Sequence, residues 1–82
     1  MKIKEEVVKV NNFDDAQVKH TTFLKMTSHF FVNLDETFKI AKKIMKESEF
    51  PIIRIVIDLR NEGIEYTQVT PLDKEPKEVE FE

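Results

Sequence analysis

The chain contains no cysteine among its 82 residues, so it has no disulfide framework, no thiolate metal site and no cysteine nucleophile. Small domains of oxidising compartments usually carry disulfides, and their absence here favours the cytoplasm. The only histidines, His20 and His29, have no cysteine to assist them and do not predict a metal site. A single glycine, Gly63, leaves no room for a glycine-rich phosphate loop.

Catalytic constellations and long apolar runs are missing as well. The chain has no nucleophile elbow, and the longest apolar run, residues 52–59, is interrupted by two charged residues and is too short to span a bilayer. Two pairs of adjacent acids fall where turn or helix-start chemistry explains them, and adjacent acids do not converge on one substrate atom. We therefore expect no enzyme, no cofactor, no metal and no membrane contact. These two pairs of adjacent acids are Asp14 with Asp15 and Asp35 with Glu36.

What the chain does contain is enough for one folded domain. Hydrophobic residues make up 40% of the sequence and charged residues 35%, which is typical of a globule and not of a disordered chain. The charge is segregated: residues 1–54 carry ten basic and eight acidic side chains, whereas residues 55–82 carry three and eight. We predict a single domain over residues 1–71 and an acidic, flexible C-terminal tail over residues 72–82.

The first half of the domain predicts two strands and a helix. Residues 3–10 alternate imperfectly, and residues 17–32 favour β-structure over a length that predicts a bulge or bend. Asn33 with Glu36 forms a capping box, and Pro51 forbids continuation, so we expect a helix that ends near Ser48 or the residue after it. Its predicted apolar stripe consists of Leu34, Thr37, Phe38, Ala41, Ile44 and Met45.

The second half predicts a β-hairpin. Residues 52–59 are apolar on both parities, which is typical of an inner strand, and Gly63 is expected to supply the positive φ of the turn. Residues 64–70 form the return strand. The loop length leaves the register open, so either Tyr66 or Val69 shares a face with the alternate apolar residues of the preceding strand.

These elements predict a small α+β domain of order β-β-α-β-β, with an antiparallel four-stranded sheet and one helix packed on one face. The uncovered face must then meet water, a second copy or a ligand. We expect it to carry some of Phe23, Phe31, Ile52 and Val56, which is more apolar than a wetted face requires.

Two groups of residues are candidates for binding. Alternate positions between residues 19 and 31 carry cations and aromatics without an acid, a mixture that single-strand nucleic-acid binders use. The same face suits packing against another protein. The candidate binding face consists of Lys19, Phe23, Lys25, His29, Phe31 and Arg54. The second group is a basic stripe on the helix, which could face solvent or contact a phosphate backbone: Lys39, Lys42, Lys43 and Lys46.

The function predicted from these patterns is a non-enzymatic binding or regulatory module. Its open sheet face would contact protein, either as a homodimer or with another partner. The alternative is a single-stranded nucleic-acid-binding protein that uses the same face together with the basic stripe. The acidic C-terminal residues either compete for a basic surface, dock on a partner or simply keep the terminus solvated.

Overall fold

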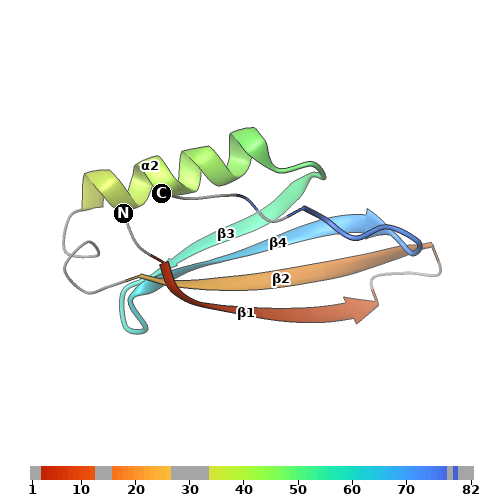
Figure 1. Cartoon of the computed structure of the whole chain (residues 1–82), viewed down its shortest axis with the longest axis horizontal. Coiled ribbons are helices and arrows are strands. Elements are labelled where there is room, and N and C mark those ends of the chain that lie inside the picture. The colour runs from red at the N-terminus through yellow and green to blue at the C-terminus, as the bar shows by residue number, and fades with distance from the viewer. Residues whose placement is uncertain (1–2, 13–15, 27–33, 78, 80–82) are drawn as a thin grey trace.

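The computed structural model describes residues 3–12, 16–26, 34–77 and 79. Four strands and one helix follow one another as β1 (Ile3–Asn12), β2 (Gln17–Met26), α2 (Leu34–Glu47), β3 (Ile52–Asp58) and β4 (Gly63–Pro71). The strands form one antiparallel sheet, and the helix between β2 and β3 lies over one face of it (Figure 1). The predicted α+β fold class and element order are confirmed.

The order of strands across the sheet is β1-β2-β4-β3. The two inner strands are therefore β2 and β4, which pair along residues 17–25 and 63–71. The prediction that residues 52–59 form an inner strand is wrong, because β3 pairs only with β4 and lies at the edge of the described sheet. A register shift between Ile52 and Arg54 places Ile52, Ile55 and Ile57 on the core-facing side of β3. Arg54, Val56 and Asp58 lie on the other side, so the strand alternates as an edge strand can.

Burial alternates without interruption along β2. The bulge expected within residues 17–32 is absent from Gln17–Met26, and residues 27–32 lie outside the described part of the chain. The register shifts that do occur lie in the outer strands, one between Ile3 and Glu5 and the other between Ile52 and Arg54. Edge strands tolerate such irregularities because only one neighbour constrains them.

The core lies between α2 and the sheet. Leu24, Met26 and Ile64 pack against Ile40 and Ile44 of the helix, and all five side chains are at most 4% exposed. Residues on this face of the sheet come from one parity of each inner strand. Tyr66 lies on the core-facing side of the sheet and pairs with Ile55, so of the two residues left open by the sequence it is Tyr66 that shares a face with Ile55 and Ile57. Ile52 also packs against the core, so the expectation that it lies on the uncovered face of the sheet is wrong.

The predicted apolar stripe of the helix is only partly correct. Its buried residues are Thr37, Ile40, Ala41 and Ile44, so Ile40 was missed. A helix on a sheet buries only the arc that faces the sheet, and the other predicted stripe residues lie on its flank. Asn33 is outside the described residues, and the helix ends at Glu47, one residue earlier than expected. The exposed flank consists of Leu34, Phe38 and Met45, with 48, 51 and 64% of their surface accessible.

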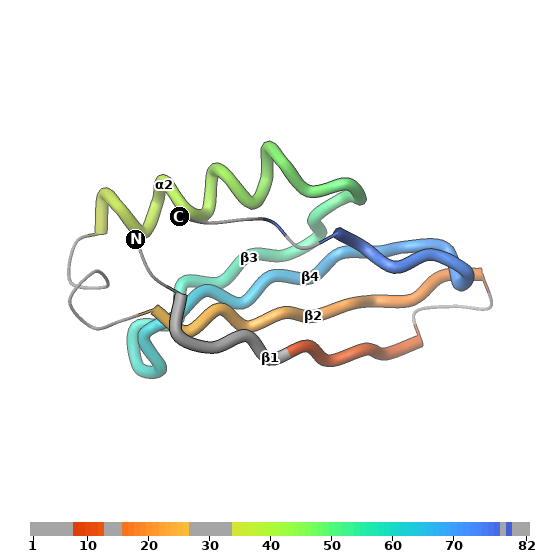
Figure 2. The backbone as a smooth tube through the Cα atoms, in the orientation of Figure 1, coloured from red at the N-terminus to blue at the C-terminus, as the bar shows by residue number. Residues whose placement is uncertain are grey.

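The C-terminal segment returns over the helix side of the sheet. Figure 2 shows it running back from the end of β4, alongside α2. Its start is held by the Leu72 backbone N–H, which donates to the Ala16 carbonyl at 3.2 Å, and Val79 is buried. The described part of the segment therefore helps to cover the core-facing side and lies away from the open face.

The turn between β3 and β4 requires glycine at position 63 because a side chain there would clash with its neighbours. Glu62, with φ of 54°, is the residue in the left-handed region, and Gly63 is not. The expectation that Gly63 supplies the positive φ is therefore wrong. A Cβ at Gly63 would lie 2.5 Å from the Leu24 carbonyl oxygen and would clash with the ring of Phe23, which crosses this position.

Replacing Gly63 with Ala should lower the free energy of unfolding by about 1–3 kcal/mol, since overpacking costs that much where backbone cannot move. Replacing Glu62 with Gly should leave stability unchanged or raise it slightly, because glycine adopts positive φ without strain. Urea unfolding of both variants measures the two effects. The opposite ranking of the two variants would show that the turn conformation assigned here is wrong.

Candidate functional site

The structure places four of the six residues of the candidate binding face on one surface. Lys19, Phe23 and Lys25 alternate along β2 on the side away from α2, and Arg54 of β3 pairs with Thr67 on the same side. The remaining two, His29 and Phe31, lie outside the described residues. We use the name open face for this side of the sheet.

The open face is more polar than the sequence predicted. Phe23 and Val56 lie on it as expected, but both are half-buried. Thr21 and Thr67 hydrogen-bond to each other at 3.0 Å in the middle of the sheet, and the Lys25 ammonium donates to the Asn61 carbonyl at 3.1 Å. A shallow hollow of about 320 Å³ surrounds Phe23 near the β3–β4 turn.

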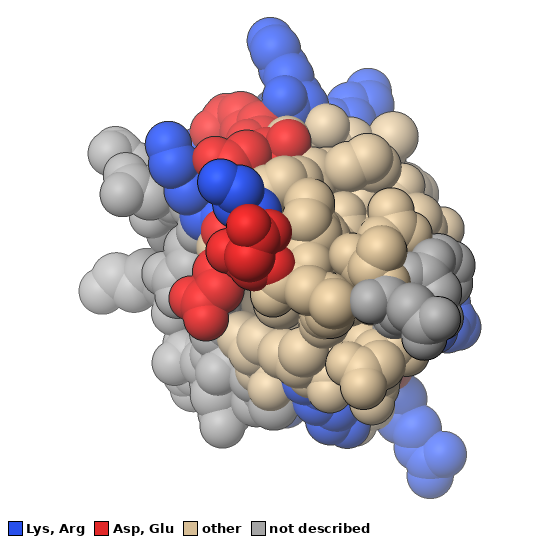
Figure 3. All heavy atoms as spheres, turned by 90° about the vertical axis from the view of Figure 1, so that its right-hand side faces the viewer, with Lys and Arg blue, Asp and Glu red and all other residues tan. Residues whose placement is uncertain are grey.

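Cations outnumber acids on the open face. Among the open-face strand residues whose side chains the structure describes, from residue 8 onward, Asp58 and Glu65 are the acids and Lys9, Lys19, Lys25 and Arg54 are the cations. Glu5 pairs with Lys25 in the same sheet. Figure 3, which views the molecule from one end, shows acidic side chains gathered in one area with basic side chains among them, and further basic side chains at the top and bottom.

Several exposed apolar side chains lie away from the open face, around the edge strand β3. Ile53 at the register shift and Leu59 just after the strand are 51 and 66% exposed. Met45 on the helix flank lines a hollow of about 320 Å³ together with residues 52–55. The apolar flank of α2 therefore meets the start of β3 at Met45. We use the name β3 edge surface for the exposed apolar residues of this flank and of β3 and its end: Leu34, Phe38, Met45, Ile53 and Leu59.

Sequence reasoning missed this surface, although a signal for it exists. Successive residues of a helix are about 100° apart around its axis, so the apolar residues of α2 occupy an arc of roughly 160°, with Ile40 and Phe38 at its two ends. This arc is wider than contact with one sheet requires. The run 52–59 shows the same excess, because it carries apolar residues on both parities. Together these excesses mark apolar surface that the single chain does not bury.

The four lysines of the basic stripe project from the side of α2 opposite its buried residues. Lys39, Lys42 and Lys46 are exposed and Lys43 is half-buried. The Lys39 ammonium lies 3.3 Å from a carboxylate oxygen of Glu36, an exposed ion pair of little energetic weight. The stripe therefore exists as a surface feature and lies on the opposite side of the molecule from the open face.

His20 donates or accepts one hydrogen bond, Nε2 to Thr70 Oγ1 at 2.9 Å. Within the described ranges, no three side chains of the His, Asp and Glu type converge as metal ligands. No helix in those ranges is long and apolar enough to cross a bilayer.

Comparison with protein-family models, with curated proteins and with solved structures finds no match. The fold and the geometry of these surfaces are therefore the basis for a functional proposal.

Asp58 organises the turn beside the open face and offers a test of its geometry. The Asn61 side-chain amide donates to one carboxylate oxygen at 2.8 Å and the Asn61 backbone N–H to the other at 3.0 Å. These bonds hold the pKa of Asp58 below its ordinary value of 3.8, with Arg60 adding a smaller effect. The stabilisation is present above pH 3.8 and is lost as the pH falls through the lowered pKa.

An NMR titration of the Asp58 carboxyl carbon should therefore give a midpoint below 3.8. In Asn61→Ala the midpoint should rise towards that value, because the strongest donor is gone. Asn11→Ala, on a distant strand, is the matched control and should leave the midpoint unchanged. An Asp58 midpoint at or above 3.8 in the parent protein would contradict the turn geometry.

Proposed function

We propose that the chain is a self-associating, non-enzymatic binding module of the cytoplasm, in which β3 pairs with β3 of a second copy. One observation carries the proposal: a strand with the composition of an inner strand lies at the sheet edge, beside exposed apolar residues of α2. Unpaired edges with apolar side chains invite pairing with another chain. A second copy would make β3 an inner strand and cover the β3 edge surface.

The side chains of β3 are self-complementary about Val56. In an antiparallel pair centred on Val56, Arg54 stands opposite Asp58 of the second copy, and the two-fold axis repeats this pair. On the core-facing side, Ile55 stands opposite Ile57 of the second copy. The same register brings exposed Ile53 towards exposed Leu59 of the second copy. Charge and apolar matching thus support the same arrangement.

The helix flank supports the same two-fold arrangement. Both helices would lie on one side of the joined sheet, and Met45 already borders the hollow above residues 52–55. Phe38 and Leu34 follow on the same flank at helical spacing, half exposed. Packing of these flanks across the two-fold axis would bury apolar surface that strand pairing alone leaves in water.

Charge reversal should separate the copies. In the Arg54→Glu variant, two acids face each other at both ends of the paired strands, and in the Asp58→Arg variant two cations face each other there. Each substitution should weaken dimerisation by roughly tenfold, because like charges directly opposite each other are unfavourable. Mixing the two variants restores an acid opposite a base in both pairs. The mixture should therefore form a heterodimer, which sedimentation equilibrium over a hundredfold concentration range will measure.

Lys46→Glu, with its charge reversed on the outer helix face, is the matched control and should dimerise like the parent. Because Asp58 also holds the turn, thermal unfolding of each variant must accompany the mass measurement. A monomeric parent protein, or a mixture no heavier than its components, would overturn this assembly.

A second candidate function is single-stranded nucleic-acid binding on the open face. The cations Lys9, Lys19, Lys25 and Arg54 and the half-buried ring of Phe23 support it. Of these cations, Lys9 and Lys25 line the hollow around Phe23, together with the acids Asp58 and Glu65. Phosphate contacts release counterions, so this function predicts affinity that falls steeply with salt, and aromatic contact adds base stacking. The lysine stripe of α2 does not extend this surface, since it lies on the opposite side of the molecule.

A fluorescent oligothymidylate titrated at several salt concentrations tests this candidate. Lys19→Gln and Lys25→Gln should each reduce the slope of log affinity against log salt by about one. Lys46→Gln on the helix is the control and should leave the slope unchanged. Absence of binding at low salt would exclude the nucleic-acid function and leave the self-association proposal intact.

A further inference from the structure

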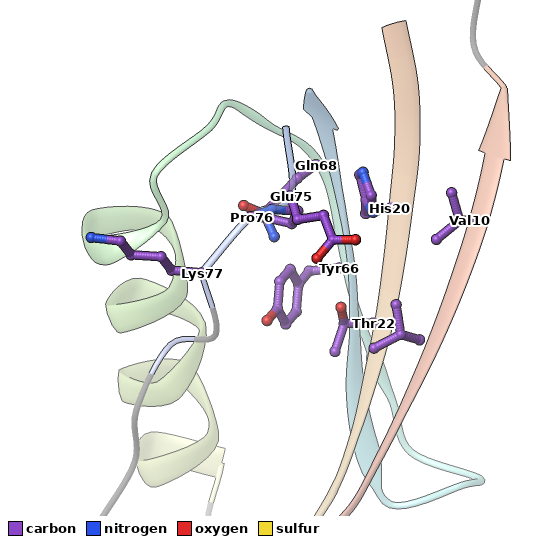
Figure 4. Close-up of a pocket in the computed structure, with 9 residues that line it drawn as sticks. Val10, His20, Thr22, Tyr66, Gln68, Glu75, Pro76 and Lys77 are labelled. Atoms are coloured by element: carbon purple, nitrogen blue, oxygen red, sulfur yellow. The ribbon is translucent and has the colours of Figure 1, made fainter. Parts of the chain in front are cut away.

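A pocket of about 240 Å³ opens on the helix side of the sheet, between β1, β2 and the C-terminal segment. It lies apart from both the open face and the β3 edge surface. Its lining combines two exposed valines, a buried polar floor and the returning chain: Val8, Val10, His20, Thr22, Tyr66, Gln68, Glu75, Pro76 and Lys77 (Figure 4).

The floor of the pocket contains an unsatisfied hydrogen-bond acceptor. Gln68 is 2% exposed, and its Oε1 has no hydrogen-bond partner in the described part of the chain. The neighbouring His20 is satisfied through Thr70 Oγ1. A buried acceptor without a partner costs free energy that an incoming donor would recover. One bridging water occupies about 30 Å³, so the pocket is roomier than a single water requires.

The charge around the pocket favours a cation. The Glu75 carboxylate extends from the C-terminal segment over the pocket, towards the strand that carries His20 (Figure 4). Lys77 also lines the opening, but its side chain is directed away, and its ammonium lies 3.9 Å from a Glu49 carboxylate oxygen. Glu75 is therefore the charged group that is directed at the pocket, among neutral side chains that can donate or accept hydrogen bonds.

The remaining walls suit a short aliphatic chain. Val8 and Val10 are 53 and 56% exposed although they stand on the core-facing side of β1, opposite Thr22 and His20. The ring of Tyr66 forms another wall, and an aromatic face attracts a cation placed over it. An occupant with an alkyl stem and a cationic head would satisfy both halves of the pocket.

We propose that this pocket binds a small primary alkylammonium ion. Its N–H groups donate to the Glu75 carboxylate and, once the Gln68 side chain turns towards the pocket, to Gln68 Oε1, which has almost no accessible surface in the structure. Its alkyl chain packs against Val8 and Val10. The proposal goes beyond the self-association function and is independent of it, because the pocket belongs to one copy and lies away from β3.

A ¹H–¹⁵N NMR titration of the full chain with butylammonium chloride tests the proposal. Saturable shifts at the amides of His20, Thr22 and Gln68 are expected, with a dissociation constant in the millimolar range for so small a ligand. Three control ligands keep the four-carbon alkyl chain. Butanol lacks the positive charge, butyrate carries a negative charge instead, and butyltrimethylammonium keeps the positive charge but has no N–H donors. None of the three should saturate at the concentration that saturates with butylammonium.

Two substitutions examine the contacts. Glu75→Gln should weaken butylammonium binding roughly tenfold, as expected for loss of a charged hydrogen-bond acceptor, and Gln68→Met should weaken it similarly. Asp73→Asn, an exposed acid of the same segment outside the pocket, is the control. Glu75 is exposed, so its replacement tests the site even if Gln68→Met does not fold. Equal binding of butylammonium and butyltrimethylammonium, or unchanged binding by Glu75→Gln, would overturn the assignment.

Discussion

A single helix of 14 residues has to cover one apolar face of a four-stranded sheet, and the rest of the architecture follows from that limit. The core lies where α2 meets β2, β4 and β3, and the C-terminal segment with buried Val79 covers part of what remains. Neither element covers the outer valines of β1 or the flank of α2 itself. Within the described ranges, the exposed apolar surfaces are therefore consequences of a sheet with few elements to cover it.

The three uncovered surfaces differ in chemistry, and this difference separates their proposed roles. The β3 edge surface is apolar and has an unpaired backbone, which suits strand pairing with an identical copy. The open face is polar and carries four cations and the ring of Phe23, which suits an extended anion. The pocket beneath Glu75 is small and contains the unpaired oxygen of Gln68, which suits a small donor. In the proposed dimer the β3 edge of each copy is paired with that of the other, while both pockets and both open faces remain accessible.

Periodicity predicted the element order, because Asn33, Glu36 and Pro51 delimit a helix and alternation delimits the strands. It could not predict strand order: β3 is apolar on both parities whether a neighbour comes from its own chain or from another. It also misassigned Gly63, since a glycine required for close approach by Phe23 looks the same in sequence as one required for positive φ. The pocket escaped prediction because Gln68 and Glu75 meet only through the return of the C-terminal segment.

The most direct test of the account is the contact across the proposed two-fold axis. In an equimolar mixture of ¹³C,¹⁵N-labelled and unlabelled protein, isotope-filtered NOE spectra report only contacts between copies. The account predicts NOEs between Val56 of one copy and Val56 of the other, and between Ile55 and Ile57 across the same axis. Intermolecular NOEs that connect Phe23 or Val69 instead would place the contact on the open face and contradict the pairing of β3.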